Sequence, residues 1–137
     1  MNTNVNNFVF SEIQGRHWNL TEVKNKSTTI NIDRTKAPID IYTIKFEPIH
    51  LTGSGAVNFY SASYVMRKNQ TLSIIRFARI LNDTLYETEN FTEYDYFRYL
   101  KRVNRWNLCD KKLELHTYDG DGERVVLIFS REGMGIG

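Results

Sequence analysis

The residues that could do acid–base, nucleophilic or metal chemistry in this sequence are few and widely spaced. They are three histidines and one cysteine: His17, His50, His116 and Cys109. No two histidines have the HxH or HExxH spacing that brings two imidazoles to one metal ion. Cys109 is expected in a loop that leads into a strand, without a helix N-terminus to activate a thiolate. We therefore interpret the histidines as ordinary strand residues and Cys109 as a buried or half-buried structural thiol. We predict no catalytic, metal-binding or cofactor-binding residue.

An acidic stretch, DGDGE over residues 119–123, begins with the spaced aspartates of a calcium loop. The twelfth position from Asp119 is Ser130, where a calcium loop carries a bidentate glutamate, and apolar residues stand where oxygen ligands are needed. Asp-Gly pairs are also what tight turns between antiparallel strands select. We interpret the stretch as the turn of a hairpin that runs from residue 113 to residue 129.

Two glycine-containing stretches resemble phosphate-binding loops only superficially. They are LTGSGAVN at residues 51–58 and GMGIG at residues 133–137. Neither is followed by a predicted helix start, which is the element that holds a phosphate. We interpret the first as a strand bend and the second as a frayed tail.

The sequence contains five Asn-x-Ser/Thr sequons, which begin at Asn19, Asn25, Asn69, Asn82 and Asn90. We attribute them mainly to turn and helix-cap chemistry. Their glycosylation would require secretion by a eukaryote.

The elements that must position these residues are mainly β-strands. Short runs with alternating apolar side chains recur between turn-forming clusters, as expected of antiparallel strands. The main runs are residues 17–23, 39–46, 59–66, 72–81, 113–118 and 125–130, with weaker runs at 30–32 and around Leu51. Seven or eight strands are enough to close a small barrel whose interior side chains fill.

One segment, residues 89–104, has helical periodicity. Tyr96, Leu100 and Val103 follow i, i+4, i+7 spacing, and Thr88 or Asn90 is expected to cap the helix. Four aromatic residues crowd it: Tyr94, Tyr96, Phe97 and Tyr99. They cannot all face one core. Packing over a wide barrel mouth is the commoner explanation, and an aromatic surface for a ligand or partner is the alternative.

The length and composition of the chain indicate one folded domain. The chain has 137 residues, of which 41% are hydrophobic and 13% aromatic, and its net charge of +2 is small for a nucleic-acid-binding protein. The longest apolar run, five residues at 125–129, is far shorter than the ~20 of a membrane span. We predict a flexible leader at 1–14, a domain at 15–132 and a flexible tail at 133–137. We expect a monomer.

The compartment depends on what precedes the sequence. The first seven residues lack the features of a secretory signal or a lipidated cysteine. We therefore expect a cell-envelope or secreted protein if a signal has been removed, with a membrane tether outside the chain, and a cytoplasmic protein otherwise. The single cysteine excludes an internal disulfide.

Several segments, in order, resemble the META domain family (HslJ-like). GRHWNL at residues 15–20 is similar to its opening strand, and TGSGAVNFYSASY at 52–64 resembles its glycine-rich signature. Residues 93–103 match the helix pattern, and LELHTYDGDGERVVLIF at 113–129 is similar to the closing hairpin. The residues that carry the resemblance are Gly15, Trp18, Leu20, Gly53, Gly55, Asn58, Tyr60, Tyr64, Glu93, Tyr96, Leu100 and Val103.

The sequence departs from the family at its two usual cysteines. Val57 stands at the first, and Leu85 and Tyr86 lie near the second, so the family's disulfide is absent. The resemblance implies an incompletely closed antiparallel barrel with one helix across it, often found in cell-envelope lipoproteins, and no enzymatic activity.

The leading hypothesis is a non-enzymatic, envelope-associated binding or stability module in an α+β, mainly β fold. Trp18 is expected to anchor the core, and the Asn58 side chain to satisfy backbone groups after Gly53 and Gly55. The alternative is a calycin-like carrier of a small apolar or lipid ligand inside the barrel. Its lining would be Phe46, Tyr64, Ile74, Phe77 and Leu115.

Overall fold

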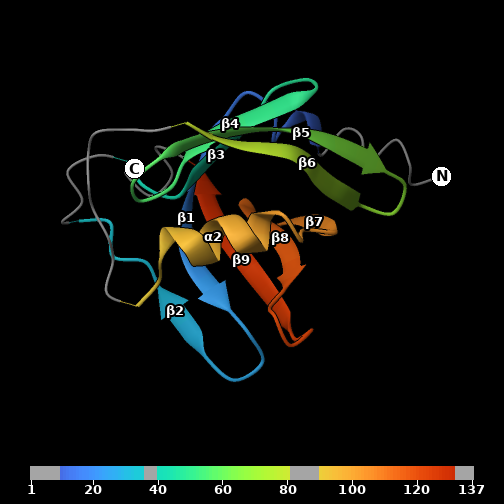
Figure 1. Cartoon of the computed structure of the whole chain (residues 1–137). Helices are drawn as coiled ribbons and strands as arrows, with labels where there is room; N and C mark the ends of the chain where they lie inside the picture. Colours follow the sequence, from blue (N-terminus) through green and yellow to red (C-terminus); the bar gives the residue numbers. More distant parts are fainter. Residues whose placement is uncertain (1–9, 36–39, 81–89, 132–137) are drawn as a thin grey trace.

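The structure, a computed structural model, describes residues 10–35, 40–80 and 90–131. These ranges form nine antiparallel strands and the helix α2 (Figure 1). The strands are β1 (His17–Lys24), β2 (Thr29–Asn31), β3 (Thr43–Phe46), β4 (His50–Ser54), β5 (Phe59–Arg67), β6 (Thr71–Ile80), β7 (Arg105–Cys109), β8 (Lys112–Tyr118) and β9 (Arg124–Arg131). Helix α2 (Glu93–Leu100) follows β6.

Eight of these strands form a ring of hydrogen-bonded neighbours. The ring runs β1, β3, β4, β5, β6, β7, β8, β9 and returns to β1, and β2 pairs with β1 outside it. Its closure is uneven, because β6 pairs with β7 only where Thr71 faces Arg105. The sheet is therefore not a regular barrel. This confirms the predicted mainly β fold with an incompletely closed antiparallel barrel.

Helix α2 lies across the place where the ring is weakest (Figure 1). Phe97 packs against Phe77 of β6 with ring centroids 5.0 Å apart, and the Tyr99 carbonyl accepts a hydrogen bond from Thr117 of β8. The helix thus joins the two sides of the sheet that β6 and β7 leave largely unpaired. The helical segments in the described ranges lack the length and apolar character of a membrane span.

The helix is shorter than the predicted residues 89–104, and its cap differs. Thr92 is the N-cap, and its hydroxyl accepts a hydrogen bond from the Asp95 amide at 3.1 Å. Asn90 lies before this cap, and Thr88 lies outside the described residues. Val103 is buried just beyond the helix, so its burial continues the apolar stripe although the backbone has left the helix.

The described part of the expected flexible leader at 1–14 is packed at residues 10 and 13, whereas residues 1–9 and the expected tail at 133–137 lie outside the described residues. Phe10 and Ile13 are 5% and 0% exposed, in a turn closed by a hydrogen bond from the Ile13 amide to the Phe10 carbonyl. Phe10 packs on Phe46 and Trp106, with centroids 5.6 and 5.3 Å apart. The reason is apolar burial: two large side chains cover one end of the barrel.

The segment around Cys109, predicted to be a loop that leads into a strand, is itself strand β7. All five of its residues, from Arg105 to Cys109, pair with residues 112–116 of β8. The strand has only five residues, with Trp106 buried and Leu108 partly buried. So short a run of alternating apolar and polar residues is weak evidence for a strand in the sequence. Pairing with β8 supplies the backbone hydrogen bonds that define the strand.

Candidate functional site

Glu93 joins the start of α2 to the turn between β4 and β5. One carboxylate oxygen accepts hydrogen bonds from the Val57 and Asn58 amides, each at 2.7 Å, and the other accepts one from the Asn58 side-chain nitrogen at 2.7 Å. Hydrogen bonds to an ionised carboxylate are the strong class in proteins. The carboxylate is therefore held by the fold, and both of its oxygens are occupied.

Two glycines of the sequence signature provide space at this junction. A Cβ at Gly55 would lie 2.5 Å from a carboxylate oxygen of Glu93. A Cβ at Gly53 would lie 2.1 Å from the Thr43 carbonyl oxygen and 2.5 Å from the Tyr60 hydroxyl. Neither glycine has positive φ. The predicted strand bend therefore does not explain these glycines. They are needed because neighbouring atoms approach the backbone so closely that a Cβ would not fit.

Two buried tyrosines converge on the space beside Gly53. The Tyr60 and Tyr96 hydroxyls lie 3.0 Å apart, and both donate to the Thr43 carbonyl, at 2.5 and 3.0 Å. Burial, which disfavours the tyrosinate anion, raises the pKa of both side chains well above the ordinary value of 10. The hydroxyls therefore stay protonated at neutral pH and serve as hydrogen-bond donors.

Asn58 plays a different part from the one expected. Its side-chain nitrogen donates to Glu93 rather than satisfying the backbone of its own turn, and its backbone carbonyl accepts from the Gly55 amide at 2.8 Å. Its side-chain oxygen has no hydrogen-bond partner among the described residues. Asn58 thus connects the turn to α2. The sequence could not show this, because the partner lies 35 residues away.

The opening strand is fixed by Trp18, as predicted for a core residue. Trp18 is 1% exposed, and its indole nitrogen donates to the Ile13 carbonyl at 3.0 Å. Gly15 adopts a positive φ of 76° and donates its amide to the Phe46 carbonyl at 2.8 Å. Leu20 is fully buried on the same strand. These residues attach the N-terminal turn to the barrel.

The META domain family matches residues 11–132, which include every one of these positions. The chain belongs to the META domain family. The predicted resemblance is confirmed. The glycine signature and the helix pattern meet where Glu93 of α2 binds the β4–β5 turn, and the opening strand holds the N-terminal turn against the barrel.

Two solved structures share the fold of this META domain. One is the NMR structure of a protein from Burkholderia xenovorans, with a TM-score of 0.61 and 16% identity, covering 90% of this chain and 86% of that one. The other is the crystal structure of a DUF4847 family protein from Bacteroides vulgatus, with a TM-score of 0.60 and 15% identity, covering 89% and 96%. No curated protein matches the chain in sequence. These likenesses show the fold alone.

The side chains proposed to line an internal ligand site pack against neighbouring side chains. Phe46 and Leu115 are 0% exposed, and the Phe46 ring lies 5.2 Å from that of Tyr64. Phe77 stacks on Tyr60 at 5.3 Å, beside α2. Ile74 is buried in the same core cluster as Phe46 and Leu115. Phe46, Ile74 and Leu115 therefore belong to the buried core, and Tyr64 and Phe77 pack against it while partly exposed.

The three histidines lie on separate strands. His17 and His50 are exposed on β1 and β4. His116 of β8 lies 3.1 Å from Glu114, two residues earlier on the same strand. A histidine–carboxylate pair forms part of many catalytic sites, in which it activates a nucleophile. Among the described residues, no serine, threonine or cysteine side chain is hydrogen-bonded to His116.

Cys109 is exposed at the end of β7, so the expectation of a buried or half-buried thiol is wrong. The reason is the unexpected β7–β8 hairpin, which places Cys109 opposite Lys112 beside the turn. Within the described ranges, no three His, Cys, Asp or Glu side chains come together as a metal site.

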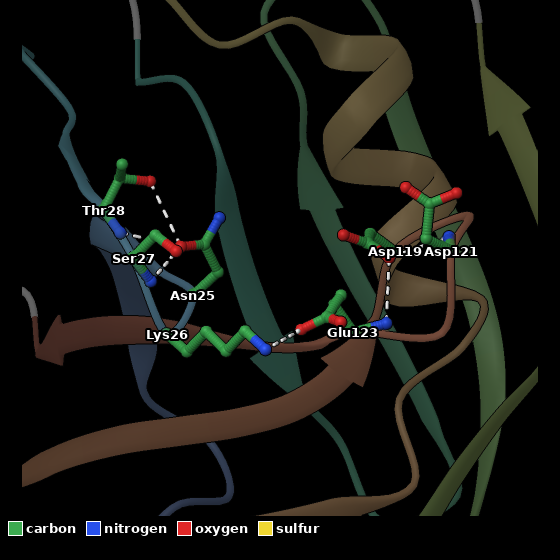
Figure 2. Close-up of polar contacts among 7 residues, drawn as sticks. All are labelled: Asn25, Lys26, Ser27, Thr28, Asp119, Asp121 and Glu123. Carbon is green, nitrogen blue, oxygen red and sulfur yellow. Dashed lines mark hydrogen bonds and ion pairs between the residues drawn. The ribbon is translucent and has the colours of Figure 1, made fainter.

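The acidic stretch at residues 119–123 is the turn of the β8–β9 hairpin, as predicted (Figure 2). One Asp119 oxygen accepts hydrogen bonds from the Asp121 and Glu123 amides at 2.8 and 3.0 Å. Glu123 forms an ion pair with Lys26 at 3.4 Å. Asn25, the first residue of a sequon, accepts hydrogen bonds from the Ser27 and Thr28 amides, so it stabilises a turn as expected.

Arg34 is a structural residue that sequence analysis missed. It donates hydrogen bonds to the Ile41 and Leu20 carbonyls and to the Asn19 side chain. It therefore attaches the chain after β2 to β1. A lone arginine in a polar connection gives no local signal for such a contact.

Proposed function

We propose that this META domain works without catalysis, as a binding module of the cell envelope whose partner contacts its outer surface. The observation that carries the proposal is the mutual packing of the described core side chains. Phe10 covers one end, and Tyr60, Phe77 and Phe97 pack together beneath α2. A binding function on this fold would therefore use the outside of the sheet or of α2.

The use of the polar groups supports the same proposal. Glu93 gives both carboxylate oxygens to the β4–β5 turn, and Tyr60 and Tyr96 give their hydroxyls to Thr43. Groups that hold the fold together in this way are poor candidates for proton transfer to a substrate. The resemblance to envelope lipoproteins supports the proposed location.

The experiment is photo-crosslinking in the organism that makes the protein. A photoreactive amino acid is placed at single exposed positions on each face of the full chain. Discrete adducts from one face only, recovered in the envelope fraction, are the expected result. Adducts of equal yield from every face, none from any face, or a soluble cytoplasmic protein would contradict the proposal.

A further inference from the structure

A basic groove runs between the outer side of α2 and the end of β6. Its volume is about 510 Å³. The lining side chains include two aromatic and four basic residues: Tyr94, Phe97, Arg79, Arg98, Lys101 and Arg102. Glu93 also lines it, but both of its carboxylate oxygens are bonded to the β4–β5 turn. The chain as a whole carries only +2, so this groove concentrates positive charge.

Three of the cations have no acidic partner in the described part of the chain. Arg79, Lys101 and Arg102 are exposed and form no ion pair with a described carboxylate, whereas Arg98 bonds Asp95 at 3.0 Å. Lys101 also lies over the Phe77 ring, 5.2 Å from its centroid. Arg98 lies 5.6 Å from the centroid of Tyr94. Lys101, held against an aromatic ring, and the exposed Arg79 and Arg102 thus lack a described counter-ion, and this favours an anionic occupant.

The arrangement favours a polypeptide over a single phosphate group. Phosphate sites gather backbone amides at a helix N-terminus, and here the Thr92 side chain caps the Asp95 amide of α2. The cations instead come from both walls of the groove and from the last turn of α2 onward. Tyrosine and arginine are the residue types enriched at protein–protein contacts, and Tyr94 is 74% exposed.

The adjoining strand also suits an extended partner. Past Leu72, the backbone of β6 pairs with β5 on one side, and within the described residues no strand pairs with its other side. A strand edge with which no other strand pairs accepts backbone hydrogen bonds from an extended chain. We propose that the groove between α2 and β6 binds an acidic, aromatic-containing segment of a partner protein. This inference rests on the proposed binding function and names the face and the chemistry of its partner.

The test is fluorescence anisotropy with a labelled synthetic peptide of about 12 residues of Asp, Glu and Tyr, a length suited to an extended groove ligand. The control peptide replaces Asp and Glu with Asn and Gln. The groove variant is Arg79→Gln/Lys101→Gln/Arg102→Gln. The matched control is Arg67→Gln/Lys68→Gln/Lys112→Gln, which removes three exposed positive charges away from the groove. Circular dichroism confirms that both variants fold.

We expect the groove variant to weaken binding about tenfold, because each cation–carboxylate contact contributes modestly and three are lost together. The control variant should change affinity less than twofold, and the uncharged peptide should not bind. Equal losses in both variants, or no binding of the acidic peptide to the wild type, would overturn the inference. So would groove-dependent binding of inorganic phosphate or phosphatidylglycerol vesicles without binding of the peptide.

Failure here is distinguishable from failure of the proposed function. Position-specific crosslinks from another face in cells would keep the binding function and reject the groove. Absence of crosslinks from every face would reject both.

Discussion

The two sides of α2 use their polar groups in opposite ways. On the inner side, Glu93 and Tyr96 have their oxygens bonded to the sheet and its turns. On the outer side, Lys101 and Arg102 have no acidic partner among the described residues. One helix thus closes the barrel with one face and presents charge to solvent with the other. The comparison separates residues kept for stability from residues available for binding.

The largest difference between the two sides is expected when one tyrosine on each side of the helix is truncated to alanine. Tyr96→Ala is expected to lower the free energy of unfolding by about 3–5 kcal/mol, because it leaves a cavity and removes the hydrogen bond from Tyr96 to the Thr43 carbonyl. Tyr94→Ala, two residues away and exposed, should cost less than about 0.5 kcal/mol. Urea unfolding of both variants measures the difference. Equal costs would remove the distinction between the two sides.

Alkaline pH tests the inner side without mutation. The pKa values of Tyr60 and Tyr96 are raised in the folded protein, so these hydroxyls stay protonated where unfolded tyrosines ionise. Their contribution is full below pH 10 and is lost as pH rises further. Stability should fall above pH ~10 with a slope approaching ~2.7 kcal/mol per pH unit for the pair.

The measurement is the free energy of unfolding across alkaline pH, with Tyr96→Phe as the control. This variant should show a shallower decline, because it lacks one of the two buried hydroxyls. A wild-type stability that stays flat through this range would show that the two hydroxyls ionise as they do in the unfolded chain.

Removing the inner carboxylate is expected to have the next largest effect. Glu93→Gln should cost about 2 kcal/mol, because three charge-assisted hydrogen bonds to Val57 and Asn58 weaken together. Asp95→Asn, which affects only the partly exposed pair with Arg98, should cost less than about 1 kcal/mol. Thermal unfolding compares the two. A larger loss for Asp95→Asn would reverse the assignment of the two sides.

The smallest effect on stability is expected from the outer cations. The triple variant Arg79→Gln/Lys101→Gln/Arg102→Gln should change the free energy of unfolding by less than about 0.5 kcal/mol, since these exposed side chains hold no ion pair in the described part of the fold. Its effect should appear in peptide binding alone. A loss of several kcal/mol would place these residues in the fold instead of in a binding surface.

The sequence predicted this fold where the pattern is local. Trp18 and Leu20 alternate on β1, and Tyr96 and Leu100 repeat on α2, so period two and the helical spacing are visible without partners. Strand β7 and the packing of Phe10 were missed, because each is defined by contact with a distant segment.

The site was predicted less well than the fold. Glycines 53 and 55 stood out in the sequence, but the atoms that demand them belong to Thr43, Tyr60 and Glu93, up to 38 residues away (93 minus 55). The outer groove had one sequence signal, the four aromatics that could not all face the core. Tyr94 is the one of them left exposed, and Arg79 joins it only through the fold.

The central claim is that this META domain binds through the outer side of α2 and not through its interior. NMR titration of the isotope-labelled protein with the acidic peptide tests this most directly. We expect chemical-shift changes at Arg79, Tyr94, Lys101 and Arg102, with the signals of the core residues Phe46 and Leu115 unchanged. Changes centred on Phe46 and Leu115, or none at the groove at saturating peptide, would contradict it.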